Sequence, residues 1–272
     1  MRRTITGFSN PTVKFLRSLR DKKHRKAERC FLAEGLRLLT DARETGRLPQ
    51  ILVMATSRTP HPLLDALEAD VAAAGGEIIE MDEALLAKVT GKDNPQAVCG
   101  VFTEFPTSLA MIDRTAAPIW LVAQALRDPG NLGTMLRTGD AVGAGGLILL
   151  DDCADPFSVE AVRSSMGAIF TQRIAQASWA EFIEWLRQGA DEQGGQLVAA
   201  SLRDARPYRG AAYAAPCFIL IGNESRGLPQ DYEDACDIRV TLPMRGRADS
   251  LNAAVAGAVL AYEVLASLSP DP

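Results

Sequence analysis

The sequence predicts an α/β protein built around a parallel sheet, and three observations support this prediction. Five apolar runs of strand length alternate with helical patterns over the C-terminal half of the chain. These runs are apolar at nearly every position, which is typical of strands that helices cover on both faces. A shorter alternating series precedes them, and a segment rich in proline and polar residues separates the two series.

The first series, residues 34–105, indicates a small α/β domain. EGLRLLTDARETG and LLDALEADVAAAGG show the apolar spacing of helices, and each ends in glycine. Strands are expected at 51–57, 77–82 and 96–105. The chain is long enough for two modest domains. We therefore expect a domain at 1–105, a linker at 106–117 and a second domain at 118–272.

The second series predicts the larger, parallel sheet. Its strands are expected at 119–126, 147–152, 196–202, 217–224 and 237–243. Helices are expected at 131–144, 158–170 and 178–190, with a last helix from about Ser250. Strands that alternate with helices in this way form doubly covered sheets, whose ligands bind at the carboxyl ends of the strands.

Composition excludes several classes of protein. No apolar run reaches the roughly 18 to 20 residues of a membrane span, and the basic N-terminus lacks the apolar core of a signal peptide. The five cysteines form no C-x-x-C pair, which indicates a reducing, cytoplasmic compartment. The histidines, His24 and His61, lie far from the motifs below, which argues against a metal site or a His-dependent triad.

Charge is divided unevenly along the chain. Residues 1–30 carry a net charge of +8, whereas the rest carries −13. A basic segment on an acidic body suggests a polyanion partner, although a solvated surface helix explains a charge run alone more simply. The candidate RNA-contacting residues are Lys14, Arg17, Arg20, Lys22, Lys23, Arg25, Lys26 and Arg29.

A glycine-containing turn follows the first strand of the second series. The strand at 119–126 runs into RDPGNLG and a helix, and ligands of α/β sheets bind at such strand–turn–helix junctions. Asn131 is a candidate N-cap, and Gly133 permits close approach of a backbone. Arg137 lies off the buried stripe of the helix, so it can face the crevice above the strand ends.

Other interpretations of this turn remain open. It could be an ordinary tight turn with a solvent-facing arginine. It could also belong to a dinucleotide-binding oxidoreductase, with Asp151 or Asp152 as the ribose-binding acid. The turn reads G-x-x-G, however, and lacks the second glycine of the G-x-G-x-x-G fingerprint. The chain also contains no P-loop sequence.

Three blocks together resemble a known family. NLGTMLRTGDAVG, FILIGNESRGLP (218–229) and LPMRGRADSLNAAVAGAVLAYE (242–263) resemble, in this order, the three motifs of the SpoU family. These are TrmH-like, S-adenosylmethionine-dependent RNA ribose 2′-O-methyltransferases. The resemblance covers about residues 119–265. The N-terminal segment from ITGFSNPTVKF onward resembles the substrate-binding extension of the rRNA-directed members.

The resemblance implies a fold as well as a partner. It implies a SPOUT-type methyltransferase domain with a C-terminal trefoil knot, usually a homodimer, preceded by a small L30e-like RNA-binding domain. The alanine-rich last helix and the glycines at 222, 227 and 246 are compatible with close backbone approach. Helix propensity alone also explains the alanines.

The resemblance further implies a cofactor site for S-adenosylmethionine. Adenine needs an apolar slot with backbone hydrogen bonds, and small residues leave room beneath it. For each apolar residue alone, core packing is the default interpretation. The candidate cofactor-binding residues are Ala200, Ser201, Leu202, Gly222, Leu242, Met244 and Leu251.

The catalytic residues that the resemblance implies are Arg137, Asn131, Glu224, Ser250 and Asn252. Arg137 could act as the base or grip a phosphate, and a guanidinium that stays protonated favours the grip. Glu224 could instead form an ion pair with Arg226, and Ser250 could cap the last helix.

We therefore expect a cytoplasmic enzyme that methylates a ribose 2′-hydroxyl in RNA, with 23S rRNA favoured over tRNA as substrate. We expect no membrane or metal partner. The alternatives are a tRNA ribose methyltransferase, an RNA-binding protein without catalysis, and a nicotinamide-dependent oxidoreductase.

Overall fold

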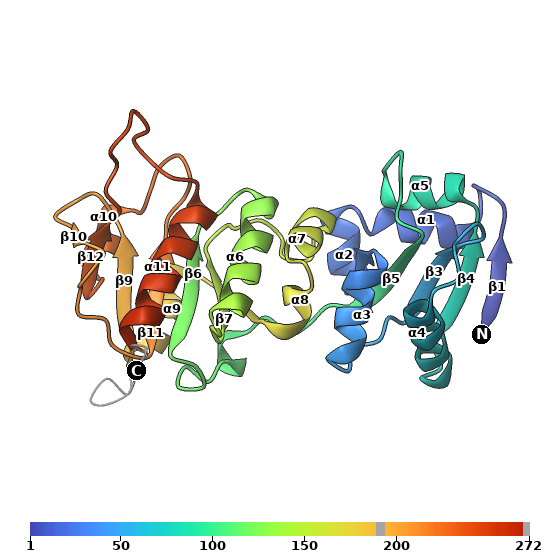
Figure 1. Cartoon of the computed structure of the whole chain (residues 1–272), viewed down its shortest axis with the longest axis horizontal. Coiled ribbons are helices and arrows are strands. Elements are labelled where there is room, and N and C mark those ends of the chain that lie inside the picture. Colours follow the sequence, from blue (N-terminus) through green and yellow to red (C-terminus); the bar gives the residue numbers. More distant parts are fainter. Residues whose placement is uncertain (189–193, 269–272) are drawn as a thin grey trace. The chain divides into compact units, whose positions relative to one another are not determined.

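The computed structural model describes residues 1–188 and 194–268, which divide into two compact units. The first unit comprises Met1–Phe105 and Asp155–Thr171. The second comprises Pro106–Ala154 and the described residues from Gln172 onward. Residues 155–171, which the sequence placed with the second domain, thus pack within the first unit. Each unit is described below by itself (Figure 1).

The first unit holds a five-stranded mixed sheet in the order β1-β4-β3-β5-β2. Its strands are β1 (Arg2–Ile5), β2 (Cys30–Glu34), β3 (Ile51–Ala55), β4 (Glu77–Met81) and β5 (Val98–Thr103). Its helices are α1 (Pro11–Ser18), α2 (Lys22–Glu28), α3 (Leu36–Glu44), α4 (Pro62–Ala73), α5 (Glu83–Thr90), α7 (Val159–Ser164) and α8 (Ala168–Thr171). Both β2 and β3 run antiparallel to β5, and the other pairings are parallel. The expected small α/β domain is confirmed.

An aromatic cluster joins residues 155–171 to the rest of the first unit. Phe157 and Phe170 pack against Phe31, and the ring centroids lie 5.1 and 6.2 Å apart. Phe102 lies 4.8 Å from Phe170 by the same measure. The single helix expected at 158–170 is interrupted, because Met166 and Gly167 have positive φ angles of 50° and 99°. The break ends α7 and starts α8 against the sheet.

A buried ion pair fixes the start of the same segment. Arg25 is 2% exposed, and its Nη2 lies 2.6 Å from Asp155 Oδ2. Its Nη1 donates to the carbonyl oxygens of Leu19 and Arg20 at 2.9 and 2.8 Å. The guanidinium is therefore used inside the unit, away from solvent. This position differs from the expected RNA contact, and we leave Arg25 out of the proposed RNA-contacting set.

The second unit holds a seven-stranded parallel sheet in the order β10-β12-β9-β11-β6-β7-β8. Its strands are β6 (Ile119–Gln124), β7 (Gly146–Leu150), β8 (Arg173–Ala177), β9 (Gln196–Ala200), β10 (Arg206–Pro207), β11 (Cys217–Ile221) and β12 (Ile238–Thr241). Its helices are η1 (Leu109–Met111), α6 (Pro129–Ala141), α9 (Trp179–Arg187), α10 (Gln230–Asp234) and α11 (Ala253–Leu268). The expected parallel sheet is confirmed. The trefoil knot stays a prediction.

Helices cover both faces of this sheet. Trp120 and Val122 of β6 pack on one face with Phe182 of α9. On the other face, α11 packs against α6, β6 and β11 (Figure 1). Because all seven strands run parallel, their carboxyl ends meet at one edge of the sheet. The loops after β6, β9, β11 and β12 therefore share that edge.

Residues 106–117, the expected linker, pack on the second unit. Leu109 and Ile112 are buried with Trp120 in one apolar cluster. Arg114 donates to the carbonyl oxygen of Leu186 at 3.0 Å, and its own carbonyl oxygen accepts from Trp120 Nε1 at 3.0 Å. In the described part of the chain, no helix is long and apolar enough to cross a membrane. The described residues also contain no cluster of His, Cys, Asp or Glu that could hold a metal ion.

The ion pair of Asp155 predicts how the first unit responds to mutation. Asp155→Asn keeps the size of the side chain but removes the ion-pair partner of the buried Arg25 guanidinium. We expect the first unit to lose about 3 kcal/mol of unfolding free energy. Hydrogen exchange of the β2 and β5 amides measures this loss.

The matched control is Asp152→Asn, because the Asp152 side chain is 73% exposed in its ion pair with Arg127. The Asp152→Asn variant should change the free energy of unfolding by less than about 1 kcal/mol. All three tryptophans lie in the second unit, so fluorescence follows that unit separately. Equal protection of β2 in the Asp155 variant and the wild type would refute the assigned role.

Candidate active site

The loop after β6 places Asn131 in the first turn of α6. The N-cap is Asp128, whose Oδ1 accepts from the backbone N–H of Asn131 at 2.7 Å, and Pro129 is the first helical residue. The expectation that Asn131 caps the helix is therefore wrong. Asp128 caps it three residues earlier, and proline suits the first helical position. The Asn131 amide is left available for contacts outside its own helix.

The loop after β11 is folded around Asn223. Asn223 Oδ1 accepts from the backbone N–H groups of Ser225 and Arg226 at 3.0 and 3.1 Å. Its Nδ2 donates to the carbonyl oxygen of Ala125, 2.8 Å away in the loop after β6. Ala125 has a φ of 48°, which is rarely adopted by residues other than glycine. Asn223, for which no role was predicted from the sequence, ties these two loops together.

Gly222 has no room for a side chain. A Cβ atom there would lie 2.6 Å from the carbonyl carbon of Gly227 and 2.7 Å from the backbone nitrogen of Leu228. Both contacts are with backbone, which cannot swing aside as a flexible side chain can. Glycine is therefore required for the loop to turn back on the end of β11.

The third loop ends at the N-terminus of α11. Asn252 Oδ1 accepts from the backbone N–H groups of Ala254 and Val255 at 2.9 and 3.3 Å, so Asn252 caps the helix. The expected cap at Ser250 is wrong, because the helix begins three residues later, at Ala253. Ser250 Oγ instead donates to Asp249 Oδ1 at 3.2 Å.

A chain of hydrogen bonds joins the three loops. Asn252 Nδ2 donates to Asn131 Oδ1 at 2.8 Å, and Asn131 Nδ2 donates to Glu224 Oε1 at 3.2 Å. The cap uses the oxygen of Asn252, which leaves its nitrogen as the donor and fixes the orientation of the Asn131 amide. We call this set the Asn252–Asn131–Glu224 chain. The alternative partner of Glu224, Arg226, forms no ion pair with it in the described residues.

Arg137 lies outside this chain of hydrogen bonds. Its side chain is exposed, whereas Leu132, Met135 and Leu136 of the same helix are buried. Within the described residues, no hydrogen bond or ion pair engages the Arg137 guanidinium. A guanidinium carries five donors and a permanent positive charge, so this group can bind an anion from outside the unit.

A cavity of about 500 Å³ opens beside the three loops. All seven residues expected at the cofactor site line it: Ala200, Ser201, Leu202, Gly222, Leu242, Met244 and Leu251. Glu224 and Ser250 also line it, whereas Asn131, Asn252 and Arg137 do not. The lining further includes Arg203 and Glu233, which the sequence did not single out. Glu233 lies in a five-residue helix, α10, where no periodic pattern can distinguish it.

The Asp151 carboxylate accepts hydrogen bonds from other residues of the second unit. Its Oδ2 accepts from Gln124 Nε2 at 3.1 Å and from the Tyr232 hydroxyl at 3.0 Å. Its Oδ1 accepts from the backbone N–H of Trp179 at 3.1 Å. Burial, aided by the hydrogen bond to Asp151, raises the pKa of Tyr232 to about 12. A carboxylate with three internal donors does not suit the ribose-binding acid that a dinucleotide site requires.

The fold and the cavity together define a class of protein. The second unit is a parallel α/β domain whose polar loops and cavity share the carboxyl edge of one sheet, as in enzymes that bind nucleotide-like cofactors. Residues 118–262 match the SpoU rRNA methylase family, and residues 10–100 match the MRM3-like substrate binding domain. The chain belongs to the SpoU rRNA methylase family, and the resemblance of its three motifs is confirmed.

Relatives and solved structures agree with this membership. The chain is 30% identical to the 23S rRNA (guanosine(2553)-2'-O)-methyltransferase RlmP of Bacillus subtilis, over 96% of this chain and 98% of the relative. The crystal structure of an AdoMet-bound rRNA methyltransferase from Sinorhizobium meliloti is 38% identical, with a TM-score of 0.88 and 97% of each chain covered. The AdoMet complex of AviRb from Streptomyces viridochromogenes is 27% identical, with a TM-score of 0.87, over 97% of this chain and 100% of that one.

Proposed function

We propose that this protein is an RNA 2′-O-methyltransferase that uses S-adenosylmethionine and acts on 23S rRNA. The observation that carries the proposal is the Asn252–Asn131–Glu224 chain, which joins three loops beside a cavity. Two similar proteins, RlmP and the Sinorhizobium meliloti enzyme, are named as rRNA methyltransferases. Their names support rRNA as the substrate class.

The cavity fits the proposed cofactor. Its volume of about 500 Å³ lies within the roughly 300–1,000 Å³ of small-molecule sites. Leu242, Met244 and Leu251 offer an apolar wall for a purine, and Gly222 brings backbone groups to the same cavity. When bound, S-adenosylmethionine supplies a methyl group activated by a sulfonium. The residues of this chain orient the groups that react and exclude water around them.

Arg137 grips a phosphate of the RNA beside the target ribose. Its guanidinium is exposed and has no partner within the described residues, so its donors are available to bind a phosphate bidentately. Because a guanidinium stays protonated, the positive charge also stabilises negative charge that develops on the ribose oxygen. Asn131 serves as a positioning residue, since its amide holds Glu224 and Asn252 in place.

The test of this function is the transfer of labelled methyl groups to purified 23S rRNA, 16S rRNA and tRNA. We expect labelled 23S rRNA, and Arg137→Ala should lower turnover about 100-fold or more without changing cofactor affinity. The matched control is Arg173→Ala, because Arg173 begins β8 at the amino edge of the sheet, opposite to the cavity. Near-normal turnover of the Arg137 variant would remove that residue from catalysis. Labelling of tRNA alone would contradict the assignment of 23S rRNA as the substrate.

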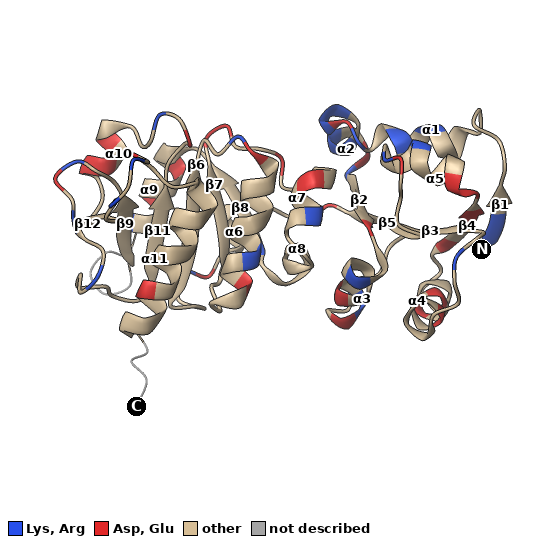
Figure 2. Ribbon diagram, turned by 45° about the horizontal axis from the view of Figure 1, so that its top comes forward, with Lys and Arg blue, Asp and Glu red and all other residues tan. Residues whose placement is uncertain are grey.

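The first unit holds the RNA through exposed cations on α1, on α2 and in the turn between them, and Figure 2 shows lysine and arginine gathered on these two helices. Phosphate contacts of this kind give affinity without sequence preference. The proposed contacts are Lys14, Arg17, Arg20, Lys22, Lys23 and Lys26, all of them exposed.

The cations of α2 predict a salt-dependent loss of RNA binding. Replacing Lys22 and Lys26 by alanine removes two phosphate contacts. The negative slope of log affinity against log salt should therefore become less steep by about 1.4 to 1.8. The control replaces Arg37 and Lys88, two exposed cations on α3 and α5 of the same unit. Filter binding across a salt series measures both slopes. Identical slopes in the two double variants would contradict RNA contacts at α2.

The proposal includes a homodimer in the cytoplasm. Val255 and Tyr262 of α11 are 47% and 54% exposed, and such apolar side chains suit an interface between copies of this chain. Sedimentation velocity should give twice the chain mass, and a monomer at micromolar concentration would contradict the dimer. All five cysteines are free thiols, which fits the reducing cytoplasm.

A further inference from the structure

A buried carboxylate lies in the wall of the cavity, and the function proposed above does not use it. Glu233 of α10 is 8% exposed and lines the cavity together with Ser201 and Arg203. The described lining holds two other carboxylates, Glu224 and Asp249, and both belong to exposed residues. Glu233 is therefore the acid that the cavity shields most from water.

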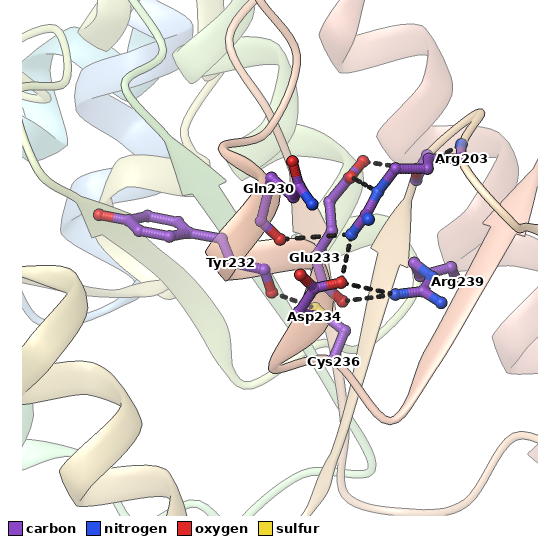
Figure 3. Close-up of polar contacts among 8 residues, drawn as sticks. Arg203, Gln230, Tyr232, Glu233, Asp234, Cys236 and Arg239 are labelled. Carbon is purple, nitrogen blue, oxygen red and sulfur yellow. Dashed lines mark hydrogen bonds and ion pairs between the residues drawn. The ribbon is translucent and has the colours of Figure 1, made fainter.

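Two protein donors hold the Glu233 carboxylate in a fixed orientation. Ser201 Oγ donates to Oε1 at 2.5 Å, and Arg203 Nε donates to Oε2 at 2.8 Å. Ser201 Oγ also accepts from the backbone N–H of Arg203 at 3.0 Å, which fixes the direction of its hydroxyl. Asp234 balances the charge, since it forms ion pairs with Arg203 and with Arg239 (Figure 3).

The carboxylate keeps acceptor positions that this network does not fill. An ionised carboxylate has about four acceptor positions, and the network occupies one on each oxygen of Glu233. Burying a charge costs free energy unless the charge is well paired, and a buried acceptor without a full set of donors costs more. A donor of a molecule bound in the cavity would fill a remaining position at little cost, because the carboxylate is already oriented.

We propose that Glu233 contacts the cofactor directly and accepts a hydrogen bond from one of its donor groups. This inference rests on the function proposed above. Among the donors of this cofactor, which are the adenine 6-amino group, the ribose hydroxyls and the α-ammonium group, we assign the contact to a ribose hydroxyl or to the α-ammonium group, and the charge of the carboxylate strengthens either hydrogen bond. The apolar side chains of the cavity, including Leu242 and Met244, offer no acceptor of comparable strength. Glu233 thereby selects an intact adenosyl amino acid over a bare purine.

The test measures ligand binding, which does not depend on turnover. Glu233→Gln keeps the size of the side chain and an acceptor for Ser201 but removes the charge. Calorimetry should show S-adenosylhomocysteine binding weakened about 10- to 100-fold, the usual effect of losing a hydrogen bond to a charged group. The matched control is Asp234→Asn, one residue along the same helix, which pairs with the same Arg203 but does not line the cavity. Its affinity should stay close to that of the wild type.

Two further ligands identify the donor. 5′-Methylthioadenosine lacks the ammonium group, and 2′,3′-dideoxyadenosine lacks both that group and the 2′- and 3′-hydroxyls of the ribose. If Glu233→Gln weakens S-adenosylhomocysteine alone, the ammonium is the donor; if it also weakens methylthioadenosine but spares dideoxyadenosine, a hydroxyl is. Both results support the contact. Equal weakening of all three ligands would show that neither a ribose hydroxyl nor the ammonium is the donor and would overturn the inference, as would equal effects of the Glu233 and Asp234 variants.

The remaining outcomes separate this inference from the proposed function. A wild-type protein that binds S-adenosylhomocysteine, beside a folded Glu233→Gln variant that binds it equally well, overturns the role of Glu233 alone. A wild-type protein that binds none of the ligands overturns both. If Glu233→Gln does not fold, Glu233→Asp keeps the charge on a shorter side chain. That variant should weaken the same ligands by a smaller factor, and unchanged affinities would again refute the contact.

Discussion

The Asn252–Asn131–Glu224 chain is the interaction on which the site depends. It joins a helix N-terminus, the loop after β11 and the cap of α11, whose residues are up to 121 positions apart in the sequence. Each amide in it has one possible orientation, because the oxygen of Asn252 is already used to cap α11. The parallel sheet makes this contact possible, since its strands end at the same edge. A rotation of one loop would break a hydrogen bond in another.

The sequence predicted this convergence but not its details. The motif blocks identified which loops meet, and the apolar strands identified the sheet. Asn131 and Ser250 were expected as helix caps, because Asn and Ser are both good caps and propensity cannot choose among neighbours. Asp128 and Asn252 cap the helices instead. Glu233 could not be found at all, since its partner Ser201 lies 32 positions away and the five residues of α10 are too few for a periodic pattern.

Local patterns of apolar residues also could not predict how the chain divides into its two units. Residues 155–171 follow β7 in the chain, yet their aromatic side chains complete the core of the first unit. A pattern of apolar residues shows that a segment is buried but not against which partner. The partner of Arg25 could not be predicted either. A segment rich in lysine and arginine has the same sequence pattern whether one of its residues binds RNA or forms an ion pair with Asp155. The stability of the first unit therefore depends on residues that follow the first 49 residues of the second unit in the sequence.

Partners, more than residue type, distinguish the arginines of this protein. Arg25 is enclosed by Asp155 and two carbonyl oxygens, and Arg203 is shared between Glu233 and Asp234. Arg137 has no such partner within the described residues and stands exposed on the helix whose first turn carries Asn131. A guanidinium that is already paired gains little from a phosphate, because it must first give up its carboxylate. An unpaired and exposed one gives up only water, so Arg137 is better suited to an RNA phosphate than Arg25 or Arg203.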